Sequence, residues 1–132
     1  MLPDKILVVD DVADSLALVR RVLEKNGFQV ITAADGEEAL LKAGTEMPGL
    51  VLLDWRMPKK DGVEVCKILK NEARTRHIPI LLFSASSDRL AQLAAEAGAD
   101  GYLSKPFAFE LLIAEVNKHL KPCQRIDSTE QW

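Results

Sequence analysis

Leu50-Val51-Leu52-Leu53-Asp54-Trp55-Arg56-Met57-Pro58 is the stretch of sequence that decides the fold. Its four leading aliphatic residues show no polar alternation, which is typical of a strand buried on both faces in a parallel sheet. The chain is expected to turn after Asp54, because Pro58 and Gly62 favour a loop. Ligands of open α/β sheets bind at the carboxyl ends of the strands, so Asp54 is the first candidate for a functional residue.

Length and composition bound the function classes. With 132 residues, 48% of them hydrophobic and 28% charged, the chain is typical of one globular domain. We expect this domain over residues 1–120, followed by a polar tail over residues 121–132. A net charge of −3 gives no general affinity for nucleic acid or anionic membranes, so neither is an expected partner.

The sequence also bears on the compartment. No apolar run is long enough to insert into a membrane, and no signal sequence precedes the first predicted strand. The two cysteines, Cys66 and Cys123, form neither a metal-binding spacing nor a disulfide framework. We therefore expect a protein of the reducing cytoplasm.

Short aliphatic runs alternate with segments of helical periodicity along the chain. Asn26-Gly27 is expected to stop the first helix and Gly44 to close the second, and Pro106 suits the first turn of the last. Five strand–helix units in strict alternation favour a doubly wound parallel sheet, an α/β three-layer fold of the flavodoxin-like type. Of the two common strand orders, 2-1-3-4-5 suits five strands. The predicted strands cover residues 5–9, 28–32, 50–53, 78–83 and 100–104.

Three carboxylates follow the first and third predicted strands: Asp10, Asp11 and Asp54. The assumed order places these strands side by side, so the carboxylates are expected to meet. Taken singly, an aspartate after a strand is most often a turn former or a helix N-cap. Together they repel, because two unit charges about 4 Å apart cost about 4 kcal/mol at an effective dielectric constant of about 20. A cation or protons would relieve this repulsion, and hard oxygen ligands suit Mg²⁺, with Mn²⁺ as an alternative.

Two further strand ends carry polar residues. Ser84 follows the fourth predicted strand and Lys105 the fifth. Taken singly, such a serine is more often a helix cap and such a lysine a solvated charge. Together with the three aspartates they supply a carboxylate nucleophile, a cation site, a hydroxyl donor and a fixed positive charge. Phosphoryl transfer depends on such positioning and charge neutralisation.

Four blocks of the sequence resemble the receiver domain of two-component response regulators. They stand in the family's order and spacing from about residue 5 to residue 120. The resemblance implies a CheY-like fold and a signalling role rather than an enzymatic one. The blocks are Ile6-Leu7-Val8-Val9-Asp10-Asp11, Leu52-Leu53-Asp54-Trp55-Arg56-Met57-Pro58 with Asp61-Gly62, Ser84-Ala85, and Gly101-Tyr102-Leu103-Ser104-Lys105-Pro106-Phe107.

The resemblance implies how phosphorylation would occur. Asp54 would accept a phosphoryl group from a histidine kinase or a histidine phosphotransfer protein. Asp11, Asp54 and the backbone carbonyl of Arg56 would bind Mg²⁺ directly, and Asp10 would act through a coordinated water. Lys105 would pair first with Asp54 and then with the phosphoryl group.

The resemblance also implies a switch. Phosphorylation adds about −1.5 to −2 units of charge at a carboxylate. Ser84 would turn toward a phosphoryl oxygen, and Tyr102 would move inward behind it. The face formed by the fourth helix, fifth strand and fifth helix would then bind a downstream effector protein or domain. Arg56 and Ser86, two residues beyond Asp54 and Ser84, would modulate the access of water. A plain surface charge is the alternative for Arg56. Trp55 is expected to be exposed beside the site.

Two other functions compete with this interpretation. Aspartyl-nucleophile phosphatases of the haloacid-dehalogenase class also combine a strand-end aspartate with Mg²⁺, a hydroxyl residue and a lysine. They typically carry a second aspartate two residues after the nucleophile, where this chain has Arg56. A flavodoxin-like binding module without phosphorylation is the other alternative, but the glycine- and hydroxyl-rich phosphate loop expected of it is missing from the sequence.

Overall fold

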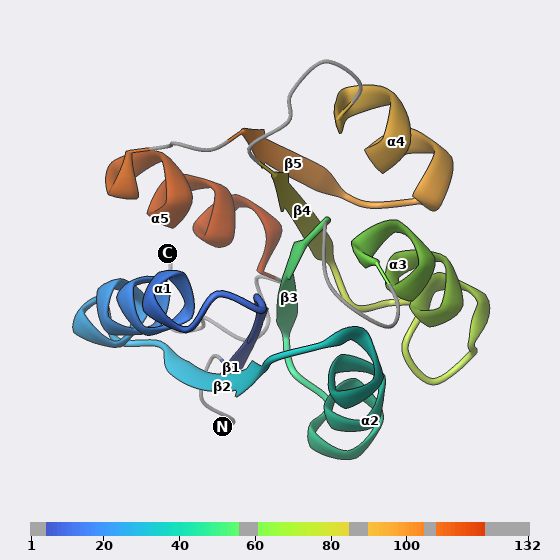
Figure 1. The fold of residues 1–132 in the computed structure, drawn as a ribbon, viewed down its shortest axis with the longest axis horizontal. Helices are drawn as coiled ribbons and strands as arrows, with labels where there is room; N and C mark the ends of the chain where they lie inside the picture. The colour runs from blue at the N-terminus through green and yellow to red at the C-terminus, as the bar shows by residue number, and fades with distance from the viewer. Residues whose placement is uncertain (1–4, 56–60, 85–89, 105–107, 121–132) are drawn as a thin grey trace, which may run out of the picture.

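The computed structural model describes residues 5–55, 61–84, 90–104 and 108–120, with the backbone alone at Ser84 and Leu90. Five parallel strands form one sheet in the order β2-β1-β3-β4-β5. The doubly wound sheet and its predicted strand order are confirmed (Figure 1). The elements are β1 Lys5–Val9, α1 Ala13–Lys25, β2 Gln29–Ala33, α2 Gly36–Glu46, β3 Leu50–Asp54, α3 Gly62–Asn71, β4 Ile80–Ser84, α4 Leu90–Ala97, β5 Gly101–Ser104 and α5 Phe109–His119.

The sheet lies between two layers of helices. Helices α1 and α5 cover one face, and α2, α3 and α4 cover the other (Figure 1). Every residue of β3 is buried. Leu50 and Leu52 pack into the core beneath α1 and α5, whereas Val51 and Leu53 pack into the core beneath α2, α3 and α4. Burial on both faces explains why this stretch has no polar alternation.

Several element boundaries differ from the prediction. The expected end of the second helix at Gly44 is wrong, because α2 continues to Glu46 and its cap is Met47, with a left-handed φ of 49°. The backbone N–H of Met47 still donates to the carbonyl of Ala43, which satisfies the last turn. The fifth helix begins at Phe109, not at the predicted Pro106, which lies outside the described residues.

The fourth strand begins later than predicted, at Ile80. The carbonyl of Pro79 nevertheless accepts a hydrogen bond of 3.0 Å from the N–H of Val51, so the proline joins the sheet through its one remaining backbone polar group. Within the described residues, none of the helices has the length and apolar content needed to cross a bilayer.

Candidate functional site

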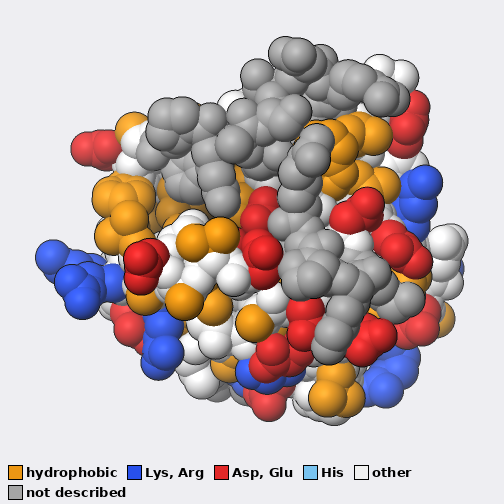
Figure 2. Space-filling model, viewed as in Figure 1, with side chains coloured by type: hydrophobic (Ala, Val, Ile, Leu, Met, Phe, Trp, Pro, Cys, Tyr) orange, Lys and Arg blue, Asp and Glu red, His pale blue; other side chains and the backbone are white. Residues whose placement is uncertain are grey.

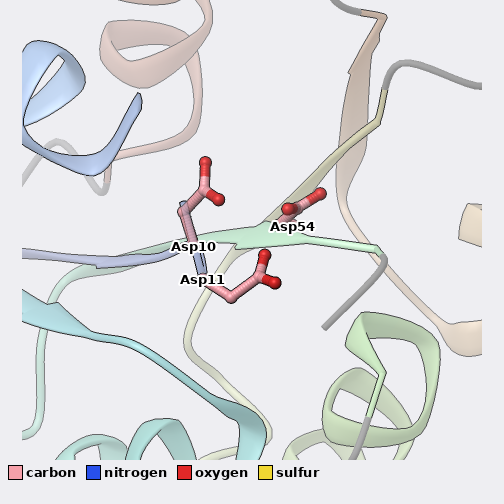
Figure 3. A group of neighbouring side chains, drawn as sticks. All are labelled: Asp10, Asp11 and Asp54. Carbon is pink, nitrogen blue, oxygen red and sulfur yellow. The ribbon is translucent and has the colours of Figure 1, made fainter. Parts of the chain in front are cut away.

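Strands β1 and β3 bring three carboxylates to one edge of the sheet. Val9 lies opposite Leu53 in the parallel register, so Asp10 and Asp54, the next residue of each strand end, are neighbours. One carboxylate oxygen from each of Asp10, Asp11 and Asp54 lies within 4.8 Å of the others. Figure 3 shows the three side chains around the ends of β1 and β3. The predicted meeting of these residues is therefore observed.

The three carboxylates differ in their surroundings. Asp10 is 1% exposed and Asp54 7%, whereas Asp11 is exposed. One oxygen of Asp10 accepts a hydrogen bond of 3.0 Å from the backbone N–H of Val12. This bond holds Asp10 at the turn into α1, so its structural role as a turn former coexists with membership of the cluster. In the surface view, acidic side chains gather near the middle of the face that carries the strand ends (Figure 2).

The first turn of α3 returns to the end of β3. The backbone N–H of Gly62 donates to the carbonyl of Trp55 over 2.6 Å. Asp61 caps the helix, because its carboxylate accepts a hydrogen bond of 2.9 Å from the N–H of Glu64. The predicted loop at Gly62 is wrong, because Gly62 is the first residue of α3. The sequence pattern does not reveal the contact with Trp55, although an Asp-Gly pair ahead of a helical pattern is a helix-start signal.

Trp55 differs from its prediction. Its side chain is half-buried rather than exposed. The backbone N–H of Trp55 donates a hydrogen bond of 2.9 Å to the carbonyl of Phe83. This bond extends the pairing of β3 and β4 by one residue beyond Asp54. This pairing fixes the backbone on the carboxyl side of the candidate phosphoacceptor.

The remaining predicted site residues lie at the ends of β4 and β5 or beyond the described ranges. Ser84 is the last residue of β4 and lies opposite Ser104 of β5 in the backbone register. The side chain of Tyr102 on β5 is 48% exposed. Three predicted site residues lie outside the described residues: Arg56, Ser86 and Lys105.

The chemistry of the acidic cluster fits a divalent cation. Its donors are carboxylate oxygens, the hard ligands that Mg²⁺ prefers, and Mg²⁺ commonly uses one or two of them with water and a phosphoryl group. Three like charges within 4.8 Å of one another repel, and a cation between them offsets this repulsion. The exposed Asp11 leaves the cluster open to solvent on one side.

Comparison with known proteins gives a consistent result. The family model of the response regulator receiver domain matches residues 6–117. The chemotaxis protein CheY4 of Vibrio cholerae superposes with a TM-score of 0.84 and 33% sequence identity, over 90% of this chain and 100% of that one. The response regulator TrrA of Thermotoga maritima, solved in complex with Mg²⁺-BeF, superposes with a TM-score of 0.81 and 36% identity, over 89% of this chain and 99% of that one.

A curated relative shows how the chain compares in length. The alkaline phosphatase synthesis transcriptional regulatory protein PhoP of Bacillus subtilis is 46% identical over 122 residues, which cover 92% of this chain and 48% of PhoP. The chain thus spans about half the length of the curated relatives that it matches.

Proposed function

The chain belongs to the receiver domain family of response regulators, and we propose that Asp54 is the residue through which it accepts a phosphoryl group. As a member of this family it is a signalling module and the phosphoacceptor of a two-component system. The observation that carries the assignment to Asp54 is the cluster itself: Asp54 ends the central strand β3, with carboxylate oxygens of Asp10 and Asp11 within 4.8 Å.

Each residue has a proposed task in the transfer. A carboxylate oxygen of Asp54 forms the new bond to phosphorus as the bond to the donor's histidine nitrogen breaks. Asp11, Asp54 and the backbone carbonyl of Arg56 would hold Mg²⁺, with Asp10 acting through a water; Mn²⁺ has the same ligand preference. When bound, the ion offsets negative charge around the phosphoryl oxygens. The hydrogen bond from the N–H of Val12 would hold the Asp10 carboxylate in place for this task.

Residues from β4 and β5 would sense the phosphoryl group. Lys105, which follows β5 in the sequence, would pair with a phosphoryl oxygen, and the Ser84 hydroxyl would donate to another. Tyr102 would move inward behind Ser84. The exposure of Tyr102, Phe109 and Leu111, each at least 40% exposed, supports a partner-binding face formed by α4, β5 and α5. Arg56 and Ser86 would control how readily water reaches the acyl phosphate.

The proposal implies two kinds of partner. A histidine kinase or a histidine phosphotransfer protein would supply the phosphoryl group, and an effector protein or domain would read the switched face. The receiver would occupy residues 1–120, with residues 121–132 as a tail. The buried, free thiol of Cys66 suits a reducing compartment, which supports a cytoplasmic location.

The half-buried Trp55 offers a direct test. In a Trp132→Phe background, addition of beryllofluoride with Mg²⁺ is expected to change the fluorescence of Trp55, because Trp55 adjoins the proposed phosphoacceptor. Asp54→Asn should abolish the change, since it removes the carboxylate oxygen that would bind beryllofluoride. Equal responses from the two proteins would contradict the assignment. Sustained hydrolysis of small phosphomonoesters would instead favour the aspartyl-nucleophile phosphatase alternative.

A further inference from the structure

The backbone of α3 meets the backbone of β3 at a point where only glycine fits. A Cβ atom built on Gly62 would lie 2.9 Å from the carbonyl carbon of Asp54 and 2.9 Å from the Cα of Trp55, and closer still to the carbonyl oxygen of Asp54. These neighbours are backbone atoms, which cannot turn away as a flexible side chain can. Any side chain at position 62 therefore requires the helix or the strand end to move.

Helix α3 is held in place from its other sides. Val65, Cys66 and Leu69 are at most 2% exposed and pack in the core beneath α2, α3 and α4. The carboxylate of Asp61 and its carbonyl accept hydrogen bonds from Glu64 and Val65, which fix the first turn. The helix thus resists displacement, and a side chain at position 62 acts mainly on the end of β3.

The end of β3 carries the Asp54 carboxylate. Two hydrogen bonds fix the backbone of this strand end. The N–H of Trp55 donates to the carbonyl of Phe83 in β4, and the N–H of Gly62 donates to the carbonyl of Trp55 over 2.6 Å. Because the three carboxylates share a space within 4.8 Å, a small shift of the Asp54 backbone changes how they converge on an ion.

We infer that Gly62 is a positioning residue: its backbone contact with Asp54 and Trp55 sets the place of the Asp54 carboxylate and thereby the affinity of the acidic cluster for Mg²⁺. This inference rests on the proposed role of Asp10, Asp11 and Asp54 as a cation site. In this role Gly62 couples α3 to the site through backbone atoms and does not itself touch the ion. Residues that orient metal ligands without binding the metal commonly change its affinity about 10- to 100-fold when replaced.

The test measures Mg²⁺ affinity rather than phosphorylation. Mg²⁺ is titrated into Trp132→Phe protein while Trp55 fluorescence is followed, with the Mg²⁺-dependent rise in melting temperature as a second readout. Gly62→Ala is expected to weaken Mg²⁺ binding about tenfold or more. Gly44→Ala is the matched control for the substitution, because a Cβ there meets nothing within 4 Å. Val65→Ala is the control for lower folding stability, since it leaves a cavity in the core beneath the same helix. Both controls should bind Mg²⁺ as the parent does.

The outcomes separate this inference from the proposed function. If the parent protein binds no Mg²⁺, the proposed cation site fails. If the parent binds Mg²⁺ and folded Gly62→Ala binds it equally well, the positioning role is wrong. The positioning role is also wrong if Val65→Ala loses as much affinity as Gly62→Ala, because the loss would then track stability.

A second pair of variants covers the case in which Gly62→Ala does not fold. Asp61→Ala removes the cap on Glu64 and loosens the first turn of α3, whereas Asp61→Asn keeps a side-chain acceptor at the cap. Asp61→Ala is expected to bind Mg²⁺ more weakly than Asp61→Asn. Equal affinities of these two variants would overturn the inference.

Discussion

The carboxylate of Asp10 accepts a hydrogen bond from the backbone N–H of Val12 at 3.0 Å. Val12 is the N-cap of α1 and makes no side-chain cap of its own, so the bond ties the acidic cluster to the start of this helix. Asp11, next in the chain, is exposed. We therefore expect the two adjacent aspartates to contribute differently to stability.

Replacement of Asp10 should reveal the value of this hydrogen bond. Asp10→Asn and Asp10→Ala both remove the charge, but only asparagine keeps an oxygen that can accept from Val12. We expect Asp10→Asn to be more stable than Asp10→Ala by about 1 kcal/mol in the free energy of unfolding. Urea unfolding without divalent ions measures the difference. Equal stabilities would mean that the bond to Val12 contributes nothing measurable.

Replacement of Asp11 should uncouple stability from the cation. Asp11→Asn relieves repulsion within the cluster, so without Mg²⁺ the variant is expected to be about 1 kcal/mol more stable than the parent. This gain is smaller than the few kcal/mol by which two close charges repel, because Asp11 is solvated. Addition of Mg²⁺ should raise the melting temperature of the parent but not of the variant, because an ion that binds only the folded state stabilises it. A variant that responds to Mg²⁺ like the parent would exclude Asp11 as a ligand.

Gly44→Ala should stabilise α2. Gly44 lies inside the helix rather than at its end, and a Cβ there meets nothing within 4 Å. The carbonyl of Gly44 still accepts a hydrogen bond of 3.1 Å from Arg74, which the substitution leaves intact. We expect the free energy of unfolding to rise by about 1 kcal/mol, measured by urea unfolding. A loss of stability would show that the glycine has a role that its surroundings do not reveal.

Glu38 should contribute stability that depends on pH. The backbone N–H of Ala34 and the ammonium of Lys42 hold the pKa of Glu38 below its ordinary value of 4.5. A lowered folded-state pKa stabilises the protein at pH values above the ordinary value, and this stabilisation is lost as the pH falls through the folded-state pKa. The side chain is 38% exposed, so solvent screening limits the contribution to less than about 1 kcal/mol.

The variant Glu38→Gln tests this dependence. It is expected to be slightly less stable than the parent at pH 7, with the difference shrinking as the pH falls below about 4. Urea unfolding of both proteins across this range measures it. A difference that stays constant down to pH 2 would show that the charge of Glu38 is not responsible.

Cys66 should be unreactive in the folded protein. Burial raises the pKa of its thiol to about 11, and its Sγ lies 3.5 Å from the carbonyl of Ala97. Since the thiolate is the reactive form, a disulfide reagent at pH 8 should modify Cys66 of a Cys123→Ser variant only as fast as the protein opens. Modification that is rapid and independent of urea would contradict this burial.

The sequence predicted the features that depend on repeated patterns. Alternating strand and helix signals indicated the doubly wound sheet, and the strand order brought Asp10, Asp11 and Asp54 together because parallel strands end at one edge. What it missed depends on contacts between segments distant in the sequence. Trp55 is half-buried, and Gly62 lies against the backbone of Asp54 and Trp55, a contact that no periodicity encodes.

Helix ends were predicted unevenly: α1 ends at Lys25, directly before the predicted stop at Asn26-Gly27, but the predicted end of α2 at Gly44 is wrong. Gly44 has the conformational freedom of a helix terminator, yet Met47 takes the left-handed position with φ 49°. Local propensity favours glycine at the left-handed position that ends a helix. Because α2 nevertheless continues past Gly44, we attribute its end at Glu46 to packing against the sheet, where Ala39 and Ala43 are fully buried.

The central claim, that Asp54 accepts the phosphoryl group, is tested most directly by trapping the product. The protein is incubated with acetyl phosphate and Mg²⁺, treated with borohydride, which reduces an aspartyl phosphate to homoserine, and analysed by peptide mass spectrometry. We predict homoserine at position 54 in the parent, and none anywhere in Asp54→Asn. Homoserine at another aspartate of the parent, with residue 54 unchanged, would contradict the account.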